Sequence, residues 1–209
     1  MEKVRLGIIG VGNMGSSHIR NYLKNEMPEF IITAVCDVKD DRLEWAKEQL
    51  PDVKTFKDAS ELMDSGEVDA ILIATPHYFH PPMVVEGLNK GLHVMSEKPA
   101  GVYTKQVREM NEVAKKSDKI FGIMFNQRTG NLFRKARDIV RGGELGRLKR
   151  TTWIITNWYR TQKYYDSGSW RATWAGEGGG VLVNQAPHQL DLWQWICGMP
   201  ECITAFCEE

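Results

Sequence analysis

The sequence predicts an α/β protein that begins with a doubly wound parallel sheet and continues into the start of a second α/β domain with an open sheet. Short runs of β-branched residues alternate with segments of helical periodicity, which is typical of parallel strands joined by crossover helices. A glycine-rich turn follows the first of these runs, and an aspartate closes the second. Together these features favour a sheet that binds a nucleotide at its carboxyl edge.

The strands of the first domain are expected within residues 1–125. Segment 68–74 is almost entirely apolar, as a strand covered on both faces must be, and Thr75-Pro76 ends it because proline cannot donate to a sheet. The other apolar runs are short and bounded by turn residues. The expected strands are 4–9, 31–36, 53–56, 68–74, 92–96 and 119–124.

Helices are expected between these strands. Acidic residues open segment 40–50, where they suit the positive end of a helix, and Asp58 with Glu61 forms a capping box for a further helix. Gly91 ends a helix at 83–89, and Thr104 is expected to cap the last long helix of the domain. The glycine-rich turn opens the first helix, at 13–24.

Residues 126–209 are expected to begin the second domain. An irregular stretch rich in aromatic and basic residues leads to Gly178-Gly179-Gly180. A lone strand with open edges at the end of the chain is not a finished sheet, so we expect the chain to be part of a longer protein. The expected elements here are a helix at 132–141, a strand at 148–156, a helix at 186–197 and a strand at 203–207.

The composition excludes several classes of partner. With 42% hydrophobic residues, 209 residues can bury a core without disulfides, and 27 basic residues balance 27 acidic ones. This balance favours neither nucleic acid nor an anionic membrane, so a small molecule is the expected partner. The N-terminus shows no signal-type apolar stretch, which favours a cytoplasmic protein. The cysteines are expected to be reduced core thiols and not zinc ligands: Cys36, Cys197, Cys202 and Cys207.

The glycine-rich turn has the fingerprint of a dinucleotide site of the Rossmann type. In Gly10-Val11-Gly12-Asn13-Met14-Gly15 the first glycine permits a tight turn, the second lets backbone approach a pyrophosphate, and the third allows close helix packing. Asp37 closes the second strand, where its carboxylate accepts hydrogen bonds from a ribose hydroxyl and repels a 2′-phosphate. NAD is therefore expected over NADP, a preference that the nearby Lys39 and Arg42 weaken.

Two further motifs resemble the Gfo/Idh/MocA family of oxidoreductases. One is Thr75-Pro76-His77 through His80, and the other is Glu97-Lys98-Pro99 after the fifth strand. Gly178-Gly179-Gly180, followed by Asn184 and His188, extends the resemblance over essentially the whole chain. The resemblance implies a Rossmann domain, a second domain with a large open sheet, a substrate cleft between them, and a homo-oligomer formed through that sheet.

Hydride transfer to or from a carbon needs a group that moves the hydroxyl proton. Lys98 is the first candidate, because it follows a strand at the edge where such sheets bind ligands and burial can lower its pKa. His188 is the second, although a lone histidine near the start of an apolar helix is also often structural. Asn184 falls where many relatives carry aspartate; its amide can position a substrate hydroxyl but cannot act as a base. Asp191 is expected to orient His188 or to stabilise local structure.

Other residues are expected to line the site. A metal at His77 and His80 is not expected, since no cysteine or carboxylate cluster accompanies them. The resemblance instead places His80 near the nicotinamide ribose, and Glu97 is expected to orient its loop or contact that ribose. The aromatic and arginine side chains suit sugar rings, hydroxyls and carboxylates, or alternatively pack between domains. Expected cofactor contacts are Gly10, Gly12, Asn13, Met14, Gly15, Asp37, Thr75, Pro76, His80, Glu97, Lys98 and Asn126; expected substrate contacts are Lys98, Arg128, Trp158, Arg160, Trp170, Arg171, Asn184 and His188.

Three functions remain open on these grounds. The first is an NAD-dependent dehydrogenase that oxidises a secondary alcohol of a sugar, an inositol or a related polyhydroxy compound. The second is a glycosidase that oxidises and re-reduces its substrate with tightly held NAD. The third is a noncatalytic dinucleotide sensor, against which the presence of both Lys98 and His188 argues.

Overall fold

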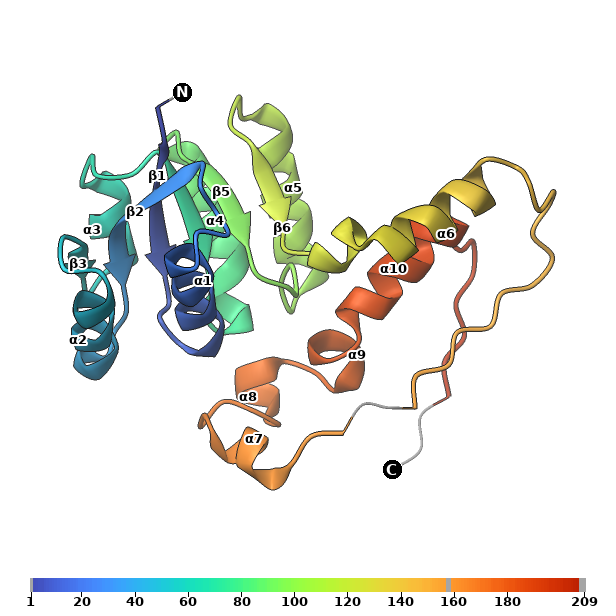
Figure 1. Ribbon diagram of the computed structural model, residues 1–209. Coiled ribbons are helices and arrows are strands. Elements are labelled where there is room, and N and C mark those ends of the chain that lie inside the picture. The colour runs from blue at the N-terminus through green and yellow to red at the C-terminus, as the bar shows by residue number, and fades with distance from the viewer. Residues whose placement is uncertain (1, 157–158, 207–209) are drawn as a thin grey trace.

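The computed structural model describes residues 2–156 and 159–206 of the 209-residue chain. Its described part contains a six-stranded parallel sheet in the order β3-β2-β1-β4-β5-β6 (Figure 1). The chain moves outward from β1 to β3 and then returns to the other side of β1, which is the doubly wound topology predicted from the sequence. The strands are β1 (Val4–Ile9), β2 (Phe30–Cys36), β3 (Lys54–Phe56), β4 (Ala70–Ile73), β5 (His93–Ser96) and β6 (Phe121–Ile123).

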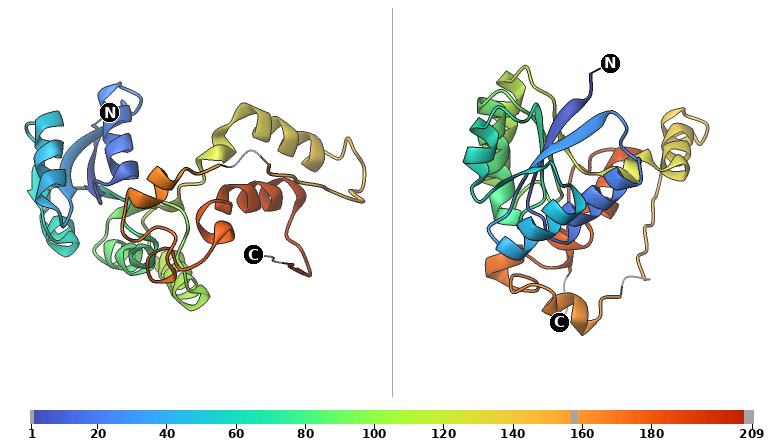
Figure 2. Two further views of the ribbon diagram at one scale, coloured as in Figure 1. Left: turned by 90° about the horizontal axis from the view of Figure 1, so that it is seen from below. Right: turned by 60° about the vertical axis from the view of Figure 1, so that its left-hand side comes forward.

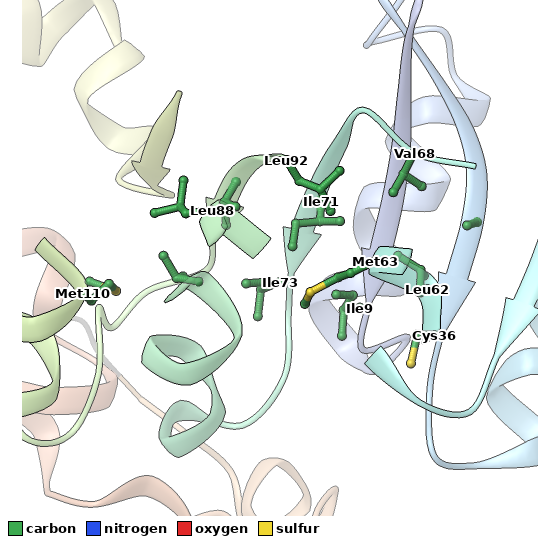
Figure 3. Packing of buried hydrophobic residues seen from close by; sticks show 13 residues of the cluster. Ile9, Cys36, Leu62, Met63, Val68, Ile71, Ile73, Leu88, Leu92 and Met110 are labelled. Atoms are coloured by element: carbon green, nitrogen blue, oxygen red, sulfur yellow. The ribbon is translucent and has the colours of Figure 1, made fainter. Parts of the chain in front are cut away.

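Helices cover both faces of this sheet. On one face, Ile19 of α1 and Leu43 of α2 pack against Ile8 of β1. On the other, α3, α4 and α5 bury side chains such as Leu62, Leu88 and Met110 in a second apolar cluster (Figure 3). Burial on both faces explains why β4 is apolar throughout. The helices are α1 (Asn13–Leu23), α2 (Asp40–Gln49), α3 (Ala59–Asp64), α4 (His80–Asn89) and α5 (Thr104–Lys116).

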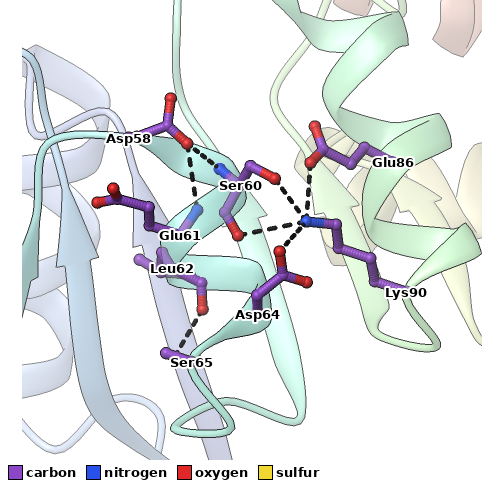
Figure 4. Close-up of polar contacts among 8 residues, drawn as sticks. All are labelled: Asp58, Ser60, Glu61, Leu62, Asp64, Ser65, Glu86 and Lys90. Atoms are coloured by element: carbon purple, nitrogen blue, oxygen red, sulfur yellow. Dashed lines mark hydrogen bonds and ion pairs between the residues drawn. The ribbon is translucent and has the colours of Figure 1, made fainter.

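Polar contacts fix α3 at its start and against α4. The Asp58 carboxylate accepts hydrogen bonds from the backbone amides of Ser60 and Glu61 at 2.8 and 3.1 Å, so the predicted cap is present (Figure 4). Lys90, just after α4, forms ion pairs with Asp64 at 2.6 Å and with Glu86 at 3.0 Å. The lysine therefore joins the ends of two helices on the same face of the sheet.

The second part of the chain is a group of helices beside the sheet. Figures 1 and 2 show the two longest, α6 (Asn131–Arg141) and α10 (Pro187–Cys197), side by side. Short helices precede α10 and lie near the carboxyl edge of the sheet, where they supply side chains to the site described below. These are α7 (Gln162–Asp166), α8 (Trp174–Glu177) and α9 (Val181–Asn184), and two 3-10 turns, η1 (His77–Phe79) and η2 (Asn126–Thr129), leave the ends of β4 and β6.

Several expectations about individual elements are wrong. Residues 148–156 and 203–206 form no strand, because no described neighbour offers them backbone partners; residue 207 lies outside the described residues. The short helices α7, α8 and α9 fall in a stretch that we expected to be irregular. Tyr103, not Thr104, is the extended residue that precedes α5, and Thr104 is already helical.

Two smaller corrections concern α4 and the cysteines. Helix α4 begins at His80, three residues before the expected start, because Pro81 and Pro82 fall in its first turn, where no backbone donor is needed. Cys36 is buried as predicted, but Cys197 is only half-buried and Cys202 is exposed beyond the end of α10. Cys207 lies outside the described residues. No helix in the described ranges is long and apolar enough to cross a bilayer.

Candidate active site

The glycine-rich turn between β1 and α1 is shaped differently at each of its glycines. Gly10 has φ +91°, and a Cβ there would lie 2.7 Å from the Ala74 carbonyl oxygen. A Cβ on Gly15 would lie 1.9 Å from the Gly10 carbonyl oxygen, so the third glycine permits close packing of α1 on the turn. At Gly12 nothing lies within 4 Å of the same position. The open face at Gly12 and the amino end of α1 fit a pyrophosphate, as the motif predicts.

The aspartate that ends β2 is held against this turn. The Asp37 carboxylate accepts one hydrogen bond from the Val11 amide at 2.7 Å and another from the Lys39 amide at 3.0 Å. Asn13 and Met14, at the start of α1, are exposed beside it. The carboxylate is thus fixed next to the glycines, where it can accept from a ribose hydroxyl.

Glu97 lies at the end of β5 and is almost fully buried, with 5% of its surface exposed. One of its carboxylate oxygens lies 2.9 Å from Nε2 of His18 on α1. The other accepts a hydrogen bond from the Lys98 amide at 3.3 Å. Glu97 therefore connects α1, the helix that follows the glycine-rich turn, to the backbone of Lys98. Of the two roles expected for it, the structure supports orientation of the loop.

The Lys98 side chain reaches from the sheet to the second part of the chain. Its Nζ donates a hydrogen bond to the backbone carbonyl oxygen of Asn184 at 2.8 Å. Burial lowers the pKa of Lys98, and the neighbouring Arg171 and Arg160 lower it further, while Glu97 and Glu177 oppose this change. A lysine in these surroundings exchanges its proton more readily than one in water.

A buried carboxylate that the sequence analysis did not identify lies next to this contact. Glu177, at the end of α8, accepts a hydrogen bond from the Asn184 side-chain amide, and both residues are 5% exposed. Asn184 therefore contacts Lys98 through its backbone carbonyl oxygen and Glu177 through its side-chain amide. In the sequence, Glu177 stands out only as a single glutamate directly before Gly178-Gly179-Gly180.

Two hydrogen bonds dock α8 on η1. His77 lies with Nδ1 2.9 Å from the Glu177 carbonyl oxygen, and the Tyr78 hydroxyl donates to the Trp174 carbonyl oxygen at 2.7 Å. Burial lowers the pKa of His77 to about 4, so its ring is neutral at pH 7 and Nδ1 donates to the carbonyl. The Trp170 ring packs edge-on against His77 at 5.1 Å between ring centroids. Trp170 is thus partly used in packing, the alternative raised from the sequence.

His188 lies in the first turn of α10, edge-on to the ring of Phe125 at 6.2 Å between centroids. Burial lowers its pKa, and the charge of Lys98 lowers it further, so the imidazole is neutral at pH 7. Its buried Nδ1 has no hydrogen-bond partner among the described residues. A neutral ring with an unused nitrogen is suited to accept a hydrogen bond or a proton from a ligand.

His80 is enclosed by the backbone at the carboxyl edge of the sheet. Its Nδ1 lies 2.7 Å from the Pro99 carbonyl oxygen, and its Nε2 lies 2.8 Å from that of Thr75. Because burial lowers its pKa, the ring is neutral and donates through one of these nitrogens. His80 therefore joins the Thr75-Pro76 turn to the Lys98-Pro99 loop and is 1% exposed. Among the described residues, no three histidine, cysteine or acidic side chains gather in a way that could hold a metal ion.

Arg128 and Asp191 form a two-pronged ion pair between η2 and α10. Arg128 Nε donates to Asp191 Oδ2 at 2.7 Å, and its Nη2 donates to Oδ1. The guanidinium also lies 5.6 Å from the centre of the Trp195 ring. Arg128 is thus engaged with Asp191, a contact that fits the second role expected for Asp191, stabilisation of local structure. Asn126, the first residue of η2, is exposed beside a shallow pocket at the end of β6.

The aromatic and basic stretch forms a cluster centred on Tyr164 of α7, a residue that the sequence analysis did not select. Arg171 Nη1 and Gln185 Nε2 both donate to the Tyr164 hydroxyl, at 2.7 and 3.1 Å. Arg160 Nε donates to Gln185 Oε1 at 3.1 Å. Of the expected substrate residues, Arg160 and Arg171 are brought together here. Trp158 lies outside the described residues.

The chain is similar to known proteins over nearly its whole length. Residues 4–125 match the model of the oxidoreductase family GFO_IDH_MocA, described as an NAD-binding Rossmann fold, and residues 133–209 match the GFO/IDH/MocA C-terminal domain. The rhizopine catabolism protein MocA of Rhizobium meliloti is 31% identical over 199 residues, which are 95% of this chain and 58% of that protein. Myo-inositol 2-dehydrogenase of Thermotoga maritima is 30% identical over 195 residues, which are 93% of this chain and 55% of that protein.

A solved structure shows the same arrangement. The WlbA dehydrogenase of Bordetella pertussis, in complex with NADH and UDP-GlcNAcA, superposes with a TM-score of 0.83 at 27% identity, over 95% of this chain and 58% of that one. The chain thus spans little more than half the length of the relatives it matches.

Proposed function

Because this chain belongs to the GFO/IDH/MocA family of oxidoreductases, we propose that it binds NAD and serves the transfer of a hydride between the cofactor and a secondary alcohol or carbonyl of a polyhydroxy compound. One observation carries the proposal: Lys98, Asn184 and His188 converge beside the carboxyl edge of a sheet whose glycine-rich turn fits a dinucleotide. The relatives include an inositol dehydrogenase and a dehydrogenase complexed with a nucleotide sugar, which supports a sugar or polyol substrate.

The chain's own residues divide the work as follows. NAD, when bound, supplies the carbon that accepts or returns the hydride. Gly12 and the start of α1 hold the pyrophosphate, and Asp37 accepts from a ribose hydroxyl. Lys98 donates a hydrogen bond to the substrate oxygen or exchanges its proton, and the neutral imidazole of His188 accepts a proton. His80 and Glu97 keep the Lys98 loop in place. Formation of a homo-oligomer and a cytoplasmic location remain predictions.

The cofactor preference is tested by titrating the chain with NADH and NADPH and following energy transfer from tryptophan to the bound dihydronicotinamide. NADH is expected to bind at least ~10-fold more tightly, about 1.4 kcal/mol, because Asp37 repels a 2′-phosphate. Asp37→Asn keeps an acceptor but removes the charge, and it should abolish most of that preference. Asp52→Asn, an exposed acid in a turn, is the control and should change neither affinity. Tighter NADPH binding would overturn the assignment of Asp37.

The reaction is tested by incubating the chain with NAD and a panel of sugars, inositols and glycosides while NADH formation and aglycone release are measured. Lys98→Met should lower the rate by ~100-fold or more, whereas Lys105→Met, at an exposed position of α5, should not change it. Release of an aglycone without net NADH would support the glycosidase instead. An activity that Lys98→Met leaves intact would overturn the role of Lys98, and a chain that binds NADH but converts none of these compounds would favour the noncatalytic sensor.

A further inference from the structure

Two arginines lie close to the lysine of the site. The Arg171 and Arg160 guanidinium carbons lie 4.4 and 4.9 Å from the centre of the Tyr164 ring. Lys98 donates a hydrogen bond to the Asn184 backbone carbonyl, and the next residue, Gln185, bonds to Arg160 and to the Tyr164 hydroxyl. The charges of both arginines also lower the pKa of Lys98. Three cations from three separate segments, the end of β5, the chain before α7 and the chain before α8, therefore converge near one another.

Two carboxylates near Lys98 partly offset its charge, but their hydrogen bonds go to groups other than the arginines. Glu97 is engaged with His18 and the Lys98 amide, and Glu177 with the Asn184 amide. Arg171 forms no ion pair with a carboxylate among the described residues; its hydrogen bond goes to the uncharged Tyr164 hydroxyl. A guanidinium that is half-buried and bound only to neutral groups retains its attraction for an anion.

The Tyr164 hydroxyl adds a donor to the same place. Its oxygen accepts from Arg171 and from Gln185, which uses both of its acceptor positions. The hydroxyl proton is then left to donate, and no described residue receives it. An oxyanion placed beside Arg171 would accept from this hydroxyl and from the guanidinium together.

We propose that the substrate carries an oxyanion, a carboxylate or a phosphate, bound by Arg171, Tyr164 and Arg160. The proposal rests on the proposed function and deepens it, because it selects acidic sugars over neutral sugars and inositols. A planar guanidinium pairs with two oxygens of either anion, whereas a neutral polyol offers no charge to pair with Arg171. The anion would also act as a counter-charge to Lys98 while the lysine holds its proton.

The test uses the full chain saturated with NADH and measures its binding of glucose, glucuronate and glucose 6-phosphate by calorimetry at constant ionic strength. At least one of the two anions is expected to bind ~10-fold or more tightly than glucose. Preference for glucuronate assigns a carboxylate and preference for glucose 6-phosphate assigns a phosphate. Equal binding of all three, or binding of none, overturns the proposal. NADH saturation is measured first, so a failure of the cofactor site is recognised separately.

Matched variants locate the preference. Arg171→Gln should reduce the anion preference by ~10-fold. Arg147→Gln removes the same charge from an exposed position after α6 and should have no effect. Tyr164→Phe keeps the ring against both guanidiniums, removes the hydroxyl and should weaken anion binding by ~3-fold or more, which tests the cluster even if Arg171→Gln does not fold. An undiminished preference in a folded Arg171→Gln or Tyr164→Phe protein overturns the proposal.

Discussion

At the scale of single residues, Gly12 and Gly15 have opposite surroundings although they share one turn. Gly12 has φ −72° and open space where a Cβ would be, whereas a Cβ on Gly15 would meet the Gly10 carbonyl oxygen at 1.9 Å. The open space at Gly12 serves the approach of a ligand. The close contact at Gly15 serves the packing of α1 on the sheet.

Substitution by alanine should therefore separate binding from stability. Gly12→Ala is expected to change the free energy of unfolding by less than about 1 kcal/mol and to weaken NADH binding by ~10-fold or more. Gly15→Ala should destabilise the protein by about 3 kcal/mol or more, because the clashing atom is backbone that cannot rotate away. Urea unfolding and NADH titration of both variants check this. A Gly12→Ala protein that binds NADH normally would contradict the assigned pyrophosphate position.

Motifs predicted some residues of the candidate site but not others. Gly10, Gly12, Gly15 and Asp37 were predictable because a turn that receives a pyrophosphate constrains the backbone itself and leaves a fixed spacing. His18 and Glu177 have no such signature, since each is a single ionisable residue that belongs to no motif. Their importance comes from contacts with residues far away in the chain, which a local pattern does not contain.

At the scale of elements, the position of Glu177 depends on the residue after it. Gly178 has φ +77°, and a Cβ there would lie 2.3 Å from the Val102 side chain. Gly178→Ala is expected to cost about 2–4 kcal/mol of stability, because both the backbone conformation and the contact with the Lys98 loop are strained. Gly180→Ala is the control, since its φ is −87° and nothing lies within 4 Å. Thermal unfolding of the two variants should differ clearly; equal melting temperatures would show that α8 is not held there.

The pair between η2 and α10 should also contribute to stability. The Asp191 side chain is only 8% exposed, and its removal leaves Arg128 without its carboxylate. Asp191→Ala is expected to destabilise the protein by about 1–3 kcal/mol, as for a partly buried ion pair that loses one member. Asp138→Ala removes an exposed acid 3.8 Å from Arg137 and should cost less than about 0.5 kcal/mol. Equal losses in denaturant unfolding would refute this difference.

Helices and strands were predicted correctly where burial imposes a regular pattern of apolar residues on the sequence. They were predicted wrongly where it does not. The strands of the first domain are covered on both faces, so their apolar runs and bounding turns were readable. Helices α7, α8 and α9 have four or five residues, too few for helical periodicity to show. Segments 148–156 and 203–206 have apolar residues typical of strands, but a strand exists only where a neighbour pairs with it.

At the scale of the whole molecule, the sheet and the second part of the chain meet through neutral buried histidines. His77 joins the end of β4 to α8 and has a pKa lowered to about 4 from an ordinary value of 6.5. Between these values the unfolded chain binds a proton that the folded protein does not. The contribution of His77 to stability is therefore complete above about pH 6.5 and is lost as the pH falls towards 4.

The difference of about 2.5 pKa units corresponds to about 3 kcal/mol of stability lost across this window. In His77→Asn an amide can replace Nδ1 as donor to Glu177 but does not titrate, so the free energy of unfolding should fall less steeply between about pH 6.5 and pH 4 than in the unsubstituted chain. Tyr78→Phe removes the companion hydrogen bond to Trp174 without changing a group that titrates in this window. It should lower stability by a similar amount at every pH. Urea unfolding at several pH values gives the free energy of unfolding of all three proteins. If this free energy changes with pH in the same way in His77→Asn and in the unsubstituted chain, titration of His77 does not make stability depend on pH.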